Sequence, residues 1–108
     1  MNVSFEEIGR LAVTFAQDGC ESGAVCKVSA NGTVAPCAAG DKFCGLVEGI
    51  RGGAAAVQVV GFARVRVSGS VNVGYVSLCA DGTGGVKAGT GREYLVVSVD
   101  ADTAVIKL

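Results

Sequence analysis

The chain has 108 residues, a formal net charge of −1, 50% hydrophobic residues, 17 glycines, and neither His nor Trp. This length supports one modest core, whereas nine basic residues against ten acidic ones lack the clustered Lys and Arg that binding a nucleic-acid backbone requires. No stretch approaches the roughly 18 uninterrupted apolar residues of a membrane span, so we expect neither nucleic-acid binding nor membrane insertion.

The residues available for chemistry are few. Without His, the chain lacks the commonest general base and the commonest metal ligand, and we expect no enzyme and no cofactor. An odd number of cysteines would leave one unpaired in a complete disulfide framework, which favours reduced, buried thiols in a cytoplasm over secretion. Disulfides or a metal site remain alternatives, although the cysteine spacing differs from zinc knuckles. The cysteines are Cys20, Cys26, Cys37, Cys44 and Cys79.

The first ten residues show no strand alternation. Ser4, followed by Glu6 and Glu7, has the character of a helix start. We therefore expect residues 1–10 to form an arm or a single helical turn, with the turn covering about residues 5–11. Residues 11–108 are expected to form a single β domain.

The remaining chain consists of short Val- and Ala-rich runs separated by glycine, a composition that favours strands. In residues 11–15, Leu11, Val13 and Phe15 share one parity, which predicts a strand with one buried face. Residues 56–67 give the strongest strand signal, but the alternation breaks around Gly61, where we expect a bulge or bend. Further strands are expected at residues 23–29, 33–35, 43–48, 75–79, 93–99 and 103–108.

The chain also contains an internal echo. Gly23, the Asn31-Gly32 turn and Phe43 are followed 50 or 51 positions later by Gly74, the Asp81-Gly82 turn and Tyr94. Asn-Gly suits a two-residue hairpin turn, so each copy predicts strand, turn, return and strand. We expect an all-β fold, either a small β-barrel or a two-sheet sandwich of short strands, with a pseudo-repeat joined by residues 56–67.

The order of these segments resembles the capsid cement (head decoration) proteins of tailed bacteriophages. The resemblance covers nearly all of residues 11–108 and rests on NGTVAP, AGDKFCGL, VNVGYVSLCADGTGGVKAG and YLVVSVDADTAVIKL. It implies a compact β-barrel on the outer surface of a phage or prophage capsid, bound to the major capsid protein and often trimeric. It implies no catalytic residue.

Two sets of residues are candidates for function. Arg64 and Arg66 share a strand face, with Arg51 upstream; the ordinary interpretation is a solvated surface, and the functional one is a protein interface, where Arg is enriched. Lys87, in a Gly-rich stretch, permits comparison with the hairpin lysine of biotinyl or lipoyl carrier domains. A carrier or binding module of that kind, as a subunit of a larger complex, is the alternative function.

The Gly-rich segments 82–85 and 89–91 lack the Lys-Ser/Thr ending of a phosphate-binding loop and are expected to be loops.

Overall fold

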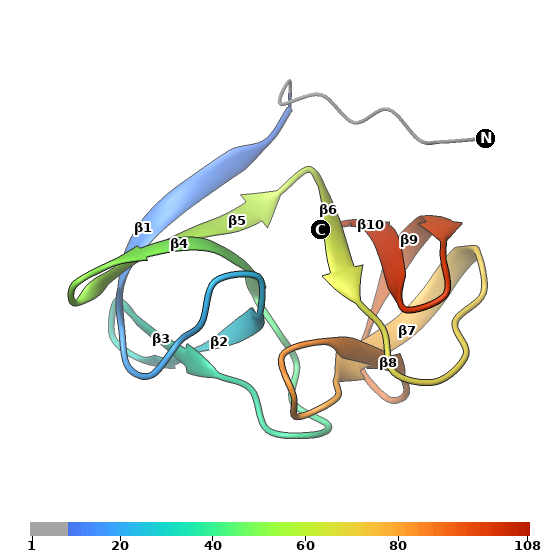
Figure 1. Cartoon of the computed structure of the whole chain (residues 1–108), viewed down its shortest axis with the longest axis horizontal. Helices are drawn as coiled ribbons and strands as arrows, with labels where there is room; N and C mark the ends of the chain where they lie inside the picture. Colours follow the sequence, from blue (N-terminus) through green and yellow to red (C-terminus); the bar gives the residue numbers. More distant parts are fainter. Residues whose placement is uncertain (1–8) are drawn as a thin grey trace.

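The computed structural model describes residues 9–108. The regular secondary structure in this part of the chain consists of β-strands alone (Figure 1). The strands are β1 (Leu11–Gln17), β2 (Val25–Ala30), β3 (Thr33–Pro36), β4 (Gly45–Arg51), β5 (Ala54–Val60), β6 (Phe62–Arg66), β7 (Gly74–Ala80), β8 (Val86–Ala88), β9 (Arg92–Val99) and β10 (Thr103–Lys107). The all-β prediction is confirmed.

The predicted N-terminal arm lies outside the described residues except for Gly9 and Arg10. Leu11 belongs to β1, so the expected helical turn is wrong at that position. Arg10 forms an ion pair with Glu48 of β4, which fastens the beginning of the described chain to the first sheet.

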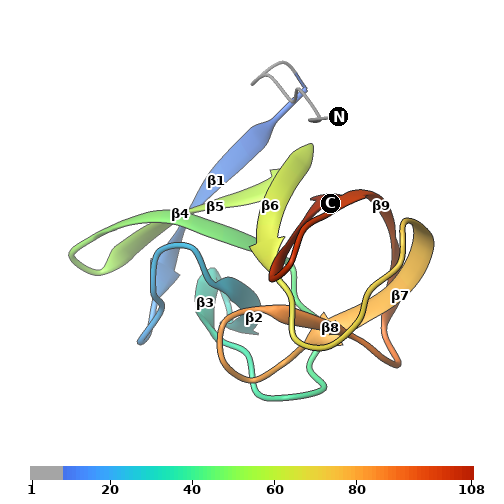
Figure 2. The same ribbon diagram turned by 45° about the vertical axis from the view of Figure 1, so that its right-hand side comes forward.

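The strands form two five-stranded units with the same connectivity. The first is a closed barrel in the order β1-β3-β2-β4-β5, and the second is a sheet in the order β6-β10-β9-β7-β8. This second sheet curls into a ring, and a single parallel bridge between Val67 and Val86 joins its two ends (Figure 2). Because β6 to β10 pair with one another as β1 to β5 do, the predicted repeat is present as a repeat of topology.

A β-bulge fixes how the two units correspond. One residue of β4, Glu48, has no partner on β5, and one residue of β9, Val97, has none on β10. Counting three residues back from each bulge aligns Gly45 with Tyr94. The sequence repeat matched Tyr94 with Phe43, whereas the strand register matches Tyr94 with Gly45, two residues later in the chain.

The long strand expected over residues 56–67 is wrong, because the chain leaves the barrel for the second sheet at Gly61. Gly61 has φ of 101°, a conformation that other residues rarely adopt. Gln58, only 2% exposed, donates from Nε2 to the carbonyl oxygens of Val60 (3.2 Å) and Phe62 (2.8 Å). These bonds satisfy two backbone carbonyls on either side of the bend.

The Gly-rich segments 82–85 and 89–91 lie outside strands, as expected, and Val86–Ala88 between them forms the short return strand β8 against β7. The loop before it is organised by the carboxylate of Asp81. This group accepts hydrogen bonds from Ser68 Oγ (2.5 Å), from the backbone and hydroxyl of Thr83 (2.7 and 2.9 Å), and from the Gly85 amide (3.1 Å). Burial alone would raise the pKa of Asp81, but these donors outweigh it and lower the pKa below 3.8.

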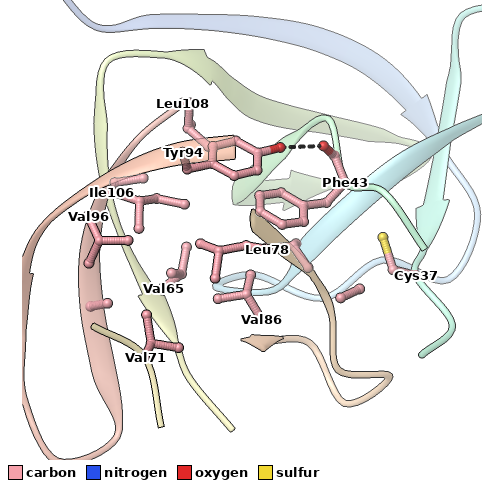
Figure 3. Close-up of a cluster of buried hydrophobic side chains, with 14 residues drawn as sticks. Cys37, Phe43, Val65, Val71, Leu78, Val86, Tyr94, Val96, Ile106 and Leu108 are labelled. Carbon is pink, nitrogen blue, oxygen red and sulfur yellow. Dashed lines mark hydrogen bonds between the residues drawn. The ribbon is translucent and has the colours of Figure 1, made fainter. Parts of the chain in front are cut away.

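Two clusters of buried hydrophobic residues fill the interior. The larger contains 14 residues, mostly from the second unit (Figure 3). Within it the rings of Phe43 and Tyr94 stack with centroids 4.8 Å apart, and the Tyr94 hydroxyl donates to the Phe43 carbonyl oxygen at 3.2 Å. Val25 and Phe43 enter this cluster from the first unit, so the two units pack against each other. The smaller cluster lies in the barrel and contains Cys26, Val34, Val47, Ala55 and Val57.

Candidate functional site

The strand β1 is the least covered strand of the barrel. It pairs with β5 from Leu11 to Ala16, but it pairs with β3 only at Ala16 and Gln17. Among the described residues, the backbone edge of residues 11–15 therefore has no strand neighbour on that side. Such an edge offers unpaired N–H and C=O groups to a partner.

Apolar side chains are exposed beside this edge. Leu11 is 52% exposed and lies opposite Val60, which is 45% exposed. Val13, two residues after Leu11, is 37% exposed, and Phe62, two residues after Val60, is 38% exposed. Single exposed hydrophobic residues are ordinary, but four of them on β1, at the end of β5 and at the start of β6 make this region a candidate interaction site. We call Leu11, Val13, Val60 and Phe62 the β1 surface.

The sequence pattern did not identify the β1 surface. The parity of Leu11, Val13 and Phe15 predicted one buried face, yet Leu11 and Val13 are exposed and Phe15 is only partly buried. This prediction is wrong because β1 continues beyond the end of β3. The available signal was the broken alternation at Val60 and Phe62, which lie on either side of the Gly61 bend.

The three arginines singled out from the sequence do not form one cluster. Arg64 and Arg66 lie on the exposed face of β6, whereas Arg51 ends β4 at the tip of the β4–β5 hairpin. The length of β5 separates that tip from the start of β6, about 20 Å at the rise of an extended strand (Figure 1). Arg51 therefore belongs to a different surface from the other two.

The two β6 arginines lie close to acidic groups of their own chain. Arg64 forms an ion pair with Asp100, with a distance of 3.3 Å between Nη1 and Oδ2. Arg66 lines a surface depression together with Asp81 and Asp102. Exposed ion pairs contribute little to stability, so these contacts add little to the free energy of folding.

The cysteines are all free, and four of them belong to the first unit. Cys20 and Cys37 line a cavity of about 220 Å³ with Glu21 and Thr83. Burial raises the pKa of the Cys37 thiol to about 11 and also raises the pKa of Cys20. These two thiols stay protonated at neutral pH and are weak nucleophiles.

The Cys26 and Cys44 sulfurs are in contact, 3.9 Å apart. Within residues 9–108 no group of three or more His, Cys, Asp or Glu side chains is arranged to hold a metal ion. In the same part of the chain, no helix is long and apolar enough to cross a membrane.

Lys87 is placed in the middle of β8, opposite Cys79, and is partly buried. It is therefore part of a strand and not of a turn. The comparison with carrier domains relied on a lysine at the turn of a hairpin, whereas Lys87 lies within a strand.

Comparisons of the chain with models of known protein families and with curated proteins find no match. The site therefore has to be interpreted from its own geometry. That geometry offers exposed apolar side chains, an open strand edge and, on β6, a pair of exposed arginines.

Proposed function

We propose that this protein is a decoration (cement) protein of a phage or prophage capsid, which binds the major capsid protein on the outer surface of the virion as a homotrimer. The observation that carries the proposal is the β1 surface, where apolar side chains adjoin an unpaired strand edge. The sequence resemblance to capsid cement proteins supports the same conclusion.

The β1 surface is the contact between protomers. Burying apolar area gives about 25 cal/mol for each Å² removed from water, and the free edge of residues 11–15 adds directional backbone hydrogen bonds. The barrel itself is closed and offers few other edges. Self-association therefore involves β1, and because the interfaces of a trimer are heterologous, β1 of one protomer contacts a different surface of the next.

Contacts with the capsid lattice involve polar side chains. Arg64 and Arg66 on β6, and Arg51 at the hairpin tip, present planar guanidinium groups that pair with carboxylates in two parallel hydrogen bonds. Each such contact is weak on an exposed surface. Three protomers on a three-fold lattice position bind durably, because each later contact forms at a high effective concentration.

The first test is the oligomeric state in solution, measured by light scattering. We expect three times the chain mass of 10.7 kDa for the unmodified protein, and a monomer for the double variant Leu11→Ser, Val60→Ser. Val73→Ser is the matched control, because Val73 is 64% exposed but lies just before β7. A strictly monomeric unmodified protein would contradict the proposal.

The second test is binding to expanded capsids that lack decoration protein, followed by sedimentation. The unmodified protein should sediment with the capsids, and the variant Arg64→Glu, Arg66→Glu should bind more weakly while remaining trimeric. If the unmodified protein stays in the supernatant at all concentrations, the assignment to capsids is wrong even if the trimer exists.

A further inference from the structure

Cys26 and Cys44 are held together by the pairing of two strands. Cys26 lies in β2 opposite Gly45, the first residue of β4, and the backbone N–H of Cys44 donates to the carbonyl oxygen of Cys26 at 2.8 Å. Their sulfur atoms are 3.9 Å apart. Hydrogen bonds between the two backbones thus hold the sulfurs next to each other.

The two thiols differ in access. Cys26 is fully buried in the barrel interior, where it packs with Val34, Val47 and Val57. Cys44 is only partly buried and lines an open surface depression of about 460 Å³ with Lys27 and Lys42. A small reagent can therefore reach Cys44 from solvent, while Cys26 is reached only through Cys44.

The contact also prepares one sulfur for reaction. When Cys26 is the donor in this contact, the hydrogen bond lowers the pKa of Cys44 despite its partial burial, and the same hydrogen bond together with burial raises the pKa of Cys26. The thiolate is the nucleophile in thiol–disulfide exchange, and attack is fastest when the thiol pKa lies near the ambient pH. The accessible sulfur is thus also the reactive one.

We propose that Cys26 and Cys44 are a redox modification site, which small-molecule disulfides such as oxidised glutathione convert to an intramolecular disulfide. The Cys44 thiolate attacks one sulfur of the reagent, forming a mixed disulfide and releasing one thiolate. Cys26 then gives its proton to the released thiolate, and the Cys26 sulfur attacks the Cys44 sulfur, displacing the second thiolate. Two protein thiols are oxidised, and one reagent disulfide is reduced to two thiols.

The reaction is selective for this pair. Among the described residues, no other two cysteine sulfurs are in contact, and Cys79 is buried in the second unit. The new bond ties β2 to the start of β4 and encloses the β2–β3 hairpin with its following loop. A cross-link of this kind restricts the unfolded chain, so oxidation stabilises the barrel unit.

The experiment uses the full chain, reduced completely and then exposed to oxidised glutathione under native conditions. The reaction is stopped with acid, the remaining thiols are alkylated in denaturant, and the intact mass is measured. We expect the number of alkylated cysteines to fall from five to three, one peptide linking Cys26 to Cys44, and a return to five after treatment with dithiothreitol. The midpoint of thermal unfolding should rise on oxidation.

Three variants test the assignment. Cys79→Ser removes a distant thiol and should fall from four alkylated cysteines to two, whereas Cys44→Ser should keep all four. Cys26→Ser should stop at the mixed disulfide on Cys44 and gain one glutathione in mass. Five alkylated cysteines after long exposure of the unmodified protein, or a linked peptide joining any other pair, would overturn the proposal. The redox proposal does not depend on the capsid assignment, because counting alkylated cysteines and identifying the linked peptide involve neither oligomers nor capsids.

Discussion

The two units share a strand order but differ in how their first strands are covered. In the second unit, β6 alternates between exposed and fully buried residues, with Ala63 and Val65 in the large cluster. In the first unit, the equivalent strand β1 has no fully buried residue. One topology thus serves two purposes, since the second unit provides most of the stabilising core while the first leaves a strand available for contact with another molecule.

The aligned positions Tyr94 and Gly45 show the same division. Tyr94 fills the large cluster, stacks on Phe43 and carries the Arg92 guanidinium 5.0 Å from its ring centre. Gly45 instead lets β4 approach β5 so closely that a Cβ atom would overlap the Gln58 backbone oxygen. At this aligned position the second unit packs around the large side chain of Tyr94, whereas the first unit has no space for a side chain at Gly45.

Replacing Tyr94 by Ala tests whether the second unit dominates stability, and it is the largest expected effect. We expect a loss of about 3–5 kcal/mol in the free energy of unfolding, measured in urea, because a buried aromatic ring is removed from a packed cluster. Tyr94→Phe keeps the stacked ring and should cost only about 1 kcal/mol for the hydrogen bond to Phe43. Equal losses for both variants would mean that the hydroxyl, and not the ring, stabilises the cluster.

Replacing Gly45 by Ala tests the close approach in the first unit. The added methyl group has no space beside Gln58 and Val57, so we expect a loss of about 2–3 kcal/mol, as is usual for overpacking. Gly49→Ala, also in β4 but with nothing near the added methyl group, should be neutral or slightly stabilising. If both variants behave alike in urea unfolding, the approach of β4 to β5 is not tight.

Replacing Gln58 by Leu tests the junction between the units. Two backbone carbonyls beside Gly61 lose their donor in a buried environment, and we expect a loss of about 2 kcal/mol. Gln17→Leu serves as control, because its amide also donates to a backbone carbonyl, that of Gly52, but at an exposed position. A smaller effect at Gln58 than at Gln17 would contradict the structural role given to the junction.

The Asp81 loop gives the smallest effect and a dependence on pH. The pKa of Asp81 is lower in the folded chain, so its ionisation stabilises the fold above about pH 4, and this contribution disappears as the pH falls below 3.8. Asp81→Asn should lose about 1 kcal/mol at pH 7, and its difference from the unmodified protein should shrink as the pH falls below about 4. A constant difference across this range would show that ionisation of Asp81 does not matter.

The sequence predicts the fold class and the repeat because both follow from local signals. Asn31-Gly32 marks a hairpin, and the spacing of turns at Gly32 and Gly82 reflects the repeat. Parity predicts which side chains share a face, but it does not reveal whether anything covers that face; hence Leu11 and Val13 were wrongly expected to be buried.

The remaining features depend on tertiary structure. The Cys26–Cys44 contact joins residues 18 positions apart through a strand pairing whose register the sequence does not encode locally. The separation of Arg51 from Arg64 depends on the change of sheet at Gly61. That glycine was recognised as a bend, but its role as the boundary between two sheets follows from the pairing of β5 with β1 and of β6 with β10.

The junction at Gly61 has a consequence for protein engineering. The amide of Leu108 donates to the Gly61 carbonyl oxygen at 2.9 Å, and the space beside Gly61 is filled by Arg10, so both ends of the described chain meet its midpoint. A circular permutant that links these ends and opens at Gly61 would exchange the order of the units while keeping every strand pair.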